Sequence, residues 1–193
     1  MPSPSDPSVD SGALSASAPA AVVPAASAPA AVSRRDDAWF EELFRTHASS
    51  VYRYFVRRAA RDDAEDLAAD VLVVAWRRRD DVPAGAELPW LYRTAGFVLA
   101  NHRRKGRPVP VGDVPESMDG DDPATYALAD ERVREALAAL SPRDRRILLL
   151  NAWEGLGPDA LAAVLGISRG GADAALSRAR SRLREVWAEA PDR

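Results

Sequence analysis

The sequence contains no cysteine, and it has only two histidines and a single lysine, Lys105. Without cysteine the chain forms no disulfide, carries no thiol nucleophile and holds no cysteine-based zinc site. Two histidines, His47 and His102, do not make a metal cluster. No nucleophile–base pair and no cofactor-binding loop is visible either. The sequence therefore predicts a protein that is not an enzyme, with no catalytic residues, no metal and no cofactor.

Long hydrophobic runs are also missing. No stretch of about 18 apolar residues is present, so we expect no membrane insertion. The N-terminus lacks the basic start and compact apolar core of a secretory signal. We therefore expect a cytoplasmic protein.

The first 33 residues contain no aromatic residue and consist almost entirely of Ala, Pro, Ser and Val. The hexapeptide SAPAAV occurs twice, at residues 17–22 and 27–32. Such a segment cannot bury enough apolar area to offset the entropy that ordering would cost. We expect residues 1–35 to form a disordered tail.

Charge is distributed unevenly along the chain, although the formal net charge is only −3. Residues 34–107 carry 15 basic and 12 acidic side chains, and residues 131–193 carry 11 basic and 9 acidic ones. Residues 108–130, by contrast, carry six acidic side chains and no basic one. Two mildly basic blocks therefore flank an acidic segment, and neither is basic enough to bind nucleic acid by charge alone.

The first basic block, residues 36–107, has the apolar periodicity of three helices. The first runs from Asp36 through Phe55, and the second follows Asp62 and Asp63, which we expect to act as N-caps. The third extends from about Glu87 to Lys105 and ends in the basic run HRRKGR, residues 102–107. Strand-like alternation is absent, so this block is expected to be an all-helical domain.

A second helical domain is expected over residues 128–190, after a flexible acidic linker at 108–127. Ser141 followed by Pro142 is typical of a helix start, and Gly155 and Gly157 are expected to end that helix. A short helix at 158–165 and a long one reaching Trp187 follow. The predicted fold class is all-α: two small helical domains, an N-terminal bundle and a C-terminal helix-turn-helix domain, joined by the linker.

The last two helices have the residues that a helix-turn-helix needs. Ala162 is small enough for close packing, Gly166 suits a left-handed turn, and Ala172 is an apolar anchor. Ser168 is the expected N-cap of the second helix. A purely structural helical hairpin is the alternative for this pair.

Three motifs occur in a specific order: DDAEDLAADVLVVAW (62–76), LPWLYRTAGFVLANHRRKGR (88–107) and LAALSPRDRRILLLNAWEGLGPDALAAVLGISRGGADAALSRARSRLR (137–184). From about Trp39 to Trp187 the chain resembles the extracytoplasmic-function (ECF) sigma factors of the sigma-70 family of bacterial RNA polymerase sigma factors. The resemblance implies that the first domain binds core RNA polymerase and the promoter minus-10 element. It implies that the second binds the minus-35 element.

The resemblance assigns residues to each surface. Core polymerase would meet Glu65, Asp66, Asp70 and Arg77, although Ala69 stands where the family often has Gln. A solvated helix face is the alternative for these acids. The melted minus-10 strand would meet an aromatic side chain and cations: Trp90, Arg93, Asn101, Arg103, Arg104, Lys105 and Arg107. Trp90 has an alternative explanation as an ordinary core residue.

The minus-35 duplex would meet the long last helix in its major groove. The candidates for base and phosphate contacts are Arg143, Arg145, Arg146, Ser168, Arg169, Gly170, Ser177 and Arg178. Residues 171–175, Gly-Ala-Asp-Ala-Ala, stand where family members commonly have Thr-Val-Lys-Ser-Arg. Few side chains there can reach base edges. We therefore expect this helix to position the DNA more than it reads the sequence.

The expected partners are core RNA polymerase, promoter DNA and an anti-sigma factor that would cover the DNA-binding domains. The leading hypothesis is a transcription initiation factor that recruits polymerase and supports DNA opening. One alternative is a helix-turn-helix regulator that acts on duplex DNA without polymerase. Another is a divergent sigma paralogue with little promoter readout, which the depleted stretch at 171–175 would explain.

Overall fold

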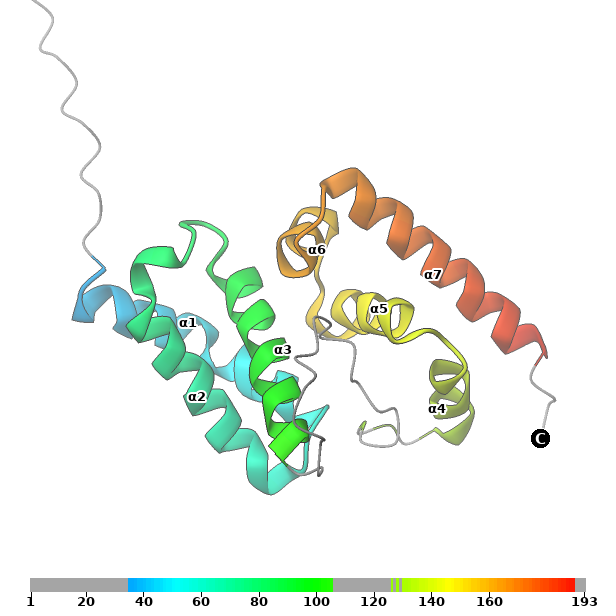
Figure 1. Cartoon of the computed structure of the whole chain (residues 1–193), viewed down its shortest axis with the longest axis horizontal. Coiled ribbons are helices and arrows are strands. Elements are labelled where there is room, and N and C mark those ends of the chain that lie inside the picture. The colour runs from blue at the N-terminus through cyan, green and yellow to red at the C-terminus, as the bar shows by residue number, and fades with distance from the viewer. Residues whose placement is uncertain (1–34, 106–125, 127, 129, 190–193) are drawn as a thin grey trace, which may run out of the picture. The chain divides into compact units, whose positions relative to one another are not determined.

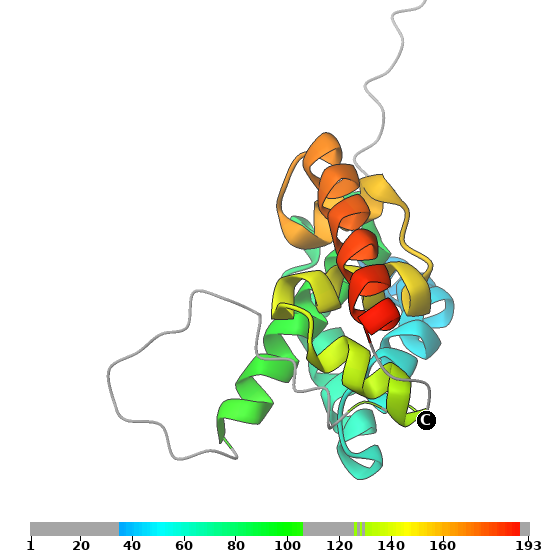
Figure 2. The same ribbon diagram turned by 90° about the vertical axis from the view of Figure 1, so that its right-hand side faces the viewer.

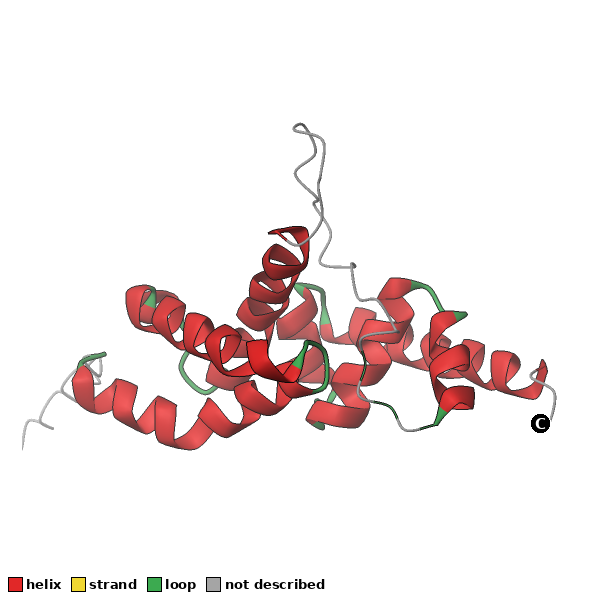
Figure 3. Cartoon of the chain, turned by 90° about the horizontal axis from the view of Figure 1, so that it is seen from below, coloured by secondary structure: helices red, strands yellow, loops and turns green. Residues whose placement is uncertain are grey.

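The computed structural model describes residues 35–105, 126, 128 and 130–189. These residues form seven α-helices and two 3₁₀ turns, with no strand among them (Figures 1 and 3). The all-α fold class is confirmed. The predicted tail and most of the predicted linker lie outside the described residues. Within the part described, no helix is both long and apolar enough to cross a bilayer.

Helix α1 (Asp37–Val56) begins where Asp36 caps it. The Asp36 side chain accepts a hydrogen bond from the backbone N–H of Trp39 at 3.2 Å, which satisfies one of the free N–H groups of the first turn. Its inward face buries Leu43, Val51 and Phe55 against α2 and α3. The helical spacing of these side chains is the reason that the sequence pattern predicted this helix correctly.

Helix α2 (Ala64–Arg77) follows a 3₁₀ turn at Arg61–Asp63. Asp63 is the N-cap residue, as predicted, but its carboxylate makes no capping hydrogen bond. It lies instead 3.3 Å from Nε2 of His102 on α3. Asp63 thus also links the start of α2 to α3.

Helix α3 (Glu87–Lys105) completes the first group of helices after a second 3₁₀ turn at Arg79–Asp81. It packs against both α1 and α2. Leu91, Ala95 and Leu99 are almost fully buried there. Their spacing of four residues keeps them on one face and leaves the opposite face of α3 free for other contacts.

Helices α4 (Glu131–Ala138) and α5 (Pro142–Glu154) open the second group. Asp130 caps α4, and the Ser141 hydroxyl caps α5 by accepting from the N–H of Asp144 at 3.1 Å. Gly155 ends α5 in the left-handed region at φ 66°, as the sequence predicted. All seven residues from Asp144 to Leu150 are buried, so α5 is the central helix of this group.

Helices α6 (Pro158–Leu165) and α7 (Arg169–Glu189) follow. Both views of the ribbon show α7 running beside α5, and α7 also contacts α4 and α6 (Figures 1 and 2). The two groups of helices meet where α3 packs against α6. The first helix of the helix-turn-helix therefore lies against the basic third helix.

Candidate nucleic-acid interface

The turn between α6 and α7 has the geometry of a helix-turn-helix. Gly166 adopts φ 68° and ψ 35°, a left-handed conformation that favours glycine. The Ser168 hydroxyl accepts from the N–H of Gly171 at 3.1 Å, and Ala172 donates to the Ser168 carbonyl at 2.9 Å. Ala162 and Ala172 are buried between the two helices. The predicted turn residue, N-cap and anchor are all confirmed.

Helix α7 exposes a row of small or polar side chains at its N-terminal half. Ala172, Ala175 and Leu176 face inward, which turns the other side of the helix to solvent. The exposed residues there are Arg169, Gly170, Asp173, Ala174, Ser177 and Arg178. Arg169 Nε lies 3.4 Å from the carboxylate of Asp159, and both side chains are exposed. The side chains available for base edges are few, as the sequence indicated.

Further along α7, two arginines contact residues of α5. Arg180 donates to Oδ1 of Asn151 at 2.8 Å, and Arg182 forms an ion pair with Asp144. Burial alone would raise the pKa of Asp144, but hydrogen bonds from Ser141 and Arg182 hold it below its ordinary value. These contacts hold α7 against α5.

Of the three arginines at the start of α5, only Arg143 is exposed. Arg145 is 5% exposed, and its guanidinium donates to the carbonyls of Leu137, Ala138 and Leu140 at 2.8–3.2 Å. Arg146 is buried as well. Their burial leaves little surface for the predicted phosphate contacts of Arg145 and Arg146, which stay predictions. The sequence could not separate them from Arg143, because all three are adjacent charges at a helix start.

On α3, Trp90 is half-buried and packs against the core. It is therefore partly a core residue, and part of its side chain remains accessible for the predicted contact with the minus-10 strand. Arg93 is exposed, yet its guanidinium lies next to the α6–α7 turn. A Cβ atom built on Gly166 would come within 3.7–3.8 Å of it. The structure thus brings a candidate minus-10 residue beside the minus-35 motif.

The basic end of α3 divides into two parts. Arg104 and Asn101 are exposed and hydrogen-bonded to each other. Arg103 is half-buried and donates to the carbonyl of Arg58 at 2.7 Å. Lys105 is the last residue of α3, and Arg107 lies outside the described residues. Among the side chains described at this end, the Arg104 guanidinium is exposed and can reach a phosphate backbone.

The predicted polymerase-binding residues are all exposed on α2: Glu65, Asp66, Asp70 and Arg77. On the same helix, Ala69, Leu72 and Val73 line an apolar groove of about 550 Å³ between α1 and α2. Its lining includes Phe44 and Val73, which are 52% and 44% exposed. The sequence pattern does not distinguish Phe44 and Val73 from the apolar residues that face the core. The signal was an apolar residue among the exposed charges of α2, which periodicity alone does not flag.

Tyr92 of α3 is buried beside Glu154 of α5, in the second group of helices. Burial raises its pKa to about 12, and the neighbouring Glu154 carboxylate on α5 contributes to the shift. An unfolded tyrosine ionises near pH 10, so above that pH the unfolded state loses a proton that the folded state keeps. We therefore expect stability to fall steadily from pH 10 to 12. Urea unfolding followed by circular dichroism at each pH measures this loss, and Tyr92→Phe should flatten it. An equal slope in both proteins would contradict the assignment.

Known protein families match the chain in two segments. The family model described as Sigma-70 region 2 matches residues 43–108, and Sigma-70, region 4 matches residues 130–183. They cover, respectively, α1–α3 from Leu43 on, and α4–α6 with most of α7. The two matches place the chain in the class of proteins that carry sigma-70 regions 2 and 4 in that order.

Curated proteins of similar sequence point to one family. The ECF RNA polymerase sigma factor SigE of Mycolicibacterium smegmatis is 31% identical over 160 residues, which are 78% of this chain and 62% of that protein. The RNA polymerase sigma-E factor of Streptomyces avermitilis is 34% identical over 155 residues, which are 76% of this chain and 83% of that protein. The chain thus spans a little less than two thirds of the first relative and most of the second.

A solved structure shows the same fold. It is the sigma factor RpoE in complex with the anti-sigma factor NepR from Bartonella quintana. The TM-score is 0.53 at 23% identity, covering 79% of this chain and 98% of that one. The chain belongs to the sigma-70 family of RNA polymerase sigma factors and to its ECF group. Sigma factors are initiation factors rather than enzymes, as the sequence predicted, and the polymerase-independent regulator is not favoured.

Proposed function

We propose that this sigma factor holds a promoter at two places while mounted on core RNA polymerase. Residues 36–107 form the domain for polymerase and the minus-10 element, and residues 128–190 form the domain for the minus-35 element. The observation that carries this proposal is the helix-turn-helix turn at Gly166 and Ser168, followed by an exposed polar face on α7.

At the minus-35 element, α7 enters the major groove and mainly positions the duplex. Arg169 and Arg178 lie on its exposed face and can donate to bases or phosphates, while Ser177 between them is short. Asp173 is the one acid on this face and is repelled by phosphate. Gly170 leaves room for close approach of the backbone, and Arg143 supplies a phosphate contact from the start of α5. Groove shape then contributes much of the selectivity.

At the minus-10 element, α3 binds the separated strand. Trp90 offers part of a ring for base stacking, and Arg104 and Asn101 offer polar groups nearby. Lys105 and Arg107 extend the same basic end along the chain. Arg93 and Arg103 join this surface once their present contacts within the protein are released.

Core polymerase binds the face of α2 that combines charge with an apolar groove. Asp66, Asp70 and Arg77 recur at i, i+4 and i+11, so they share one side of the helix, and Glu65 lies beside them. The adjoining groove presents Val73 to the same partner. A charged rim around a partly exposed apolar surface is typical of a protein interface.

Two further expectations follow from family membership. The protein acts in the cytoplasm, where core polymerase and the chromosome are. It also has an anti-sigma partner, since the related RpoE of Bartonella quintana was solved bound to an anti-sigma factor. Such a partner would cover the surfaces of α3 and α7 that bind DNA.

Runoff transcription with purified core polymerase on genomic fragments tests the proposed function. The wild-type chain should give discrete start sites that core enzyme alone does not give. Asp70→Lys should reduce both co-purification with core polymerase and transcript yield by about tenfold or more, because it reverses a charge at the docking face. Asp62→Lys, an equally exposed change outside that face, serves as the matched control.

The possible outcomes separate the candidate functions. Polymerase binding without promoter-specific transcripts would identify the divergent paralogue with little promoter readout. Equal effects of Asp70→Lys and Asp62→Lys would contradict the assignment of the polymerase face.

A further inference from the structure

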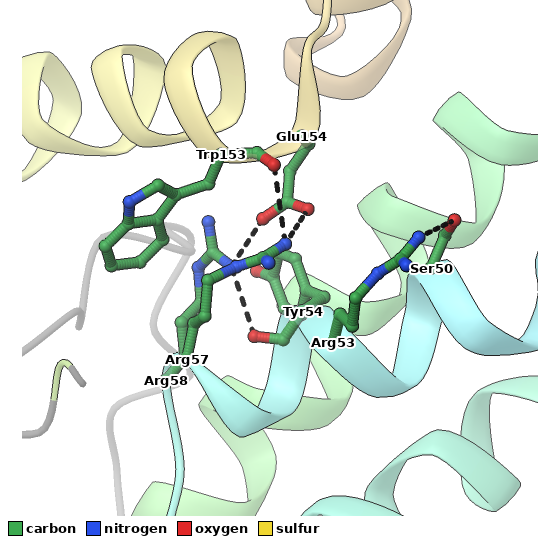
Figure 4. A network of polar contacts seen from close by, with 7 residues as sticks. All are labelled: Ser50, Arg53, Tyr54, Arg57, Arg58, Trp153 and Glu154. Atoms are coloured by element: carbon green, nitrogen blue, oxygen red, sulfur yellow. Dashed lines mark hydrogen bonds and ion pairs between the residues drawn. The ribbon is translucent and has the colours of Figure 1, made fainter.

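A buried carboxylate from the second group of helices is held by two arginines of the first (Figure 4). Glu154, the last residue of α5, accepts from Arg58 at 2.7 Å and from Arg57 at 2.5 Å, both at the C-terminal end of α1. The side chains of Glu154 and Arg58 are 1% and 2% exposed. This ion pair therefore lies away from water, although its partners are 96 residues apart in sequence.

Aromatic rings enclose the ion pair. The Arg58 guanidinium lies 3.9 Å from the ring centre of Tyr54 and 5.0 Å from that of Trp153. Tyr126, at the end of the acidic segment, meets Trp153 edge-on with ring centres 5.6 Å apart. Together with Tyr92, whose hydroxyl interacts with the carboxylate, these residues form what we call the Glu154 cluster: Tyr54, Arg57, Arg58, Tyr92, Tyr126, Trp153 and Glu154.

The Glu154 cluster gives the contact between the helix groups two distinct states. Two charges taken out of water are tolerated only while they neutralise each other closely. Partial separation would leave both charges poorly solvated, whereas full separation returns both to water. The contact is therefore expected to be either closed or open, with little in between.

The closed state involves residues that the proposed function assigns to DNA. Arg93 of α3 lies against the turn at Gly166, and α6 packs along α3. Arg103 donates its hydrogen bond to the carbonyl of Arg58, one of the two arginines that hold Glu154. The helix-turn-helix therefore occupies space next to Arg93 that a promoter strand bound there would need.

We propose that the Glu154 cluster holds the free protein closed, with α6 covering part of the promoter-binding face of α3, and that the cluster must open before both helices bind DNA. This role rests on the proposed function, because it concerns the same two DNA-binding surfaces. Tyr126 makes the end of the acidic segment part of the contact. Displacement of Tyr126 from Trp153 therefore favours opening.

Glu154→Gln tests the closed state directly. The substitution keeps the shape of the side chain but removes its charge, so that the buried Arg58 guanidinium loses its counter-ion. Water can solvate Arg58 only in the open state, and the variant is expected to populate that state. The free protein should then bind a labelled duplex of about 30 base pairs at least about tenfold more tightly than wild type. Its radius of gyration in small-angle X-ray scattering should increase as well.

Glu42→Gln is the matched control, because it removes the carboxylate of an exposed ion pair with Arg45 on α1. It should change neither duplex affinity nor the radius of gyration. Tyr126→Leu removes the aromatic contact with Trp153 without altering charge, and it should shift both quantities as Glu154→Gln does, by less. If circular dichroism shows Glu154→Gln to be unfolded, Tyr126→Leu and Arg57→Ala decide the matter.

Folded variants with wild-type duplex affinity and radius of gyration would overturn the closed state. Transcription by the wild-type protein keeps this result distinct from failure of the proposed function. If wild type gives core-dependent transcripts while Glu154→Gln changes nothing, only the closed state is wrong. If wild type gives no transcripts, the sigma function is wrong, and the scattering data still report whether the Glu154 cluster closes the chain.

Discussion

Phe55→Ala should lower the free energy of unfolding by about 3–5 kcal/mol, the usual cost of truncating a buried phenylalanine. Phe55 is 0% exposed at the centre of α1–α3 and meets the Tyr54 ring edge-on at 5.3 Å between ring centres. Truncation removes this contact and leaves a cavity that rigid neighbouring helices fill only in part. Urea unfolding followed by circular dichroism measures the change.

Phe44→Ala is the matched control for Phe55→Ala, since Phe44 lies on the same helix but is 52% exposed. Its effect on stability should stay within about 0.5 kcal/mol, as for most surface changes. It should instead weaken co-purification with core polymerase, because Phe44 lines the groove between α1 and α2. Equal losses of stability in the two variants would show that the core is not organised around Phe55.

Arg145→Ala should destabilise the second group of helices by about 2–4 kcal/mol. The Arg145 guanidinium satisfies three carbonyls at the end of α4, and its removal leaves these acceptors and a cavity inside the protein. Arg143→Ala, two residues earlier and exposed, should leave stability nearly unchanged and lower affinity for DNA. Thermal unfolding and duplex binding, measured on both variants, test the assignment. A stable Arg145→Ala protein with impaired DNA binding would support the original sequence-based prediction for that residue.

Local features of the fold were largely predictable from the sequence. Ser141 with Pro142, Gly155 and Gly166 determine where helices begin and end, because their effects act within one turn of chain. The inward faces of α1 and α7 followed from apolar periodicity. Asp63 was the exception, since a carboxylate in a good capping position found a partner, His102, on another helix.

Contacts distant in sequence were not predictable. Arg145 and Arg146 look like solvent-exposed charges, and only the three-dimensional structure shows that they are buried. Likewise, nothing in the sequence around Glu154 predicts its contacts with Arg57 and Arg58. Helical periodicity identifies a face but not what covers it, so the contact between α3 and α6 required the three-dimensional structure.

The burial of Arg58 and Glu154 also has a consequence for ionic strength. Mobile ions screen charges that they can approach, so they weaken phosphate contacts of exposed arginines steeply but scarcely reach a pair that is 1–2% exposed. Added salt is thus expected to weaken binding of promoter DNA while leaving the ion pair between Arg58 and Glu154 intact. Rising ionic strength therefore favours the proposed closed state over the DNA-bound one.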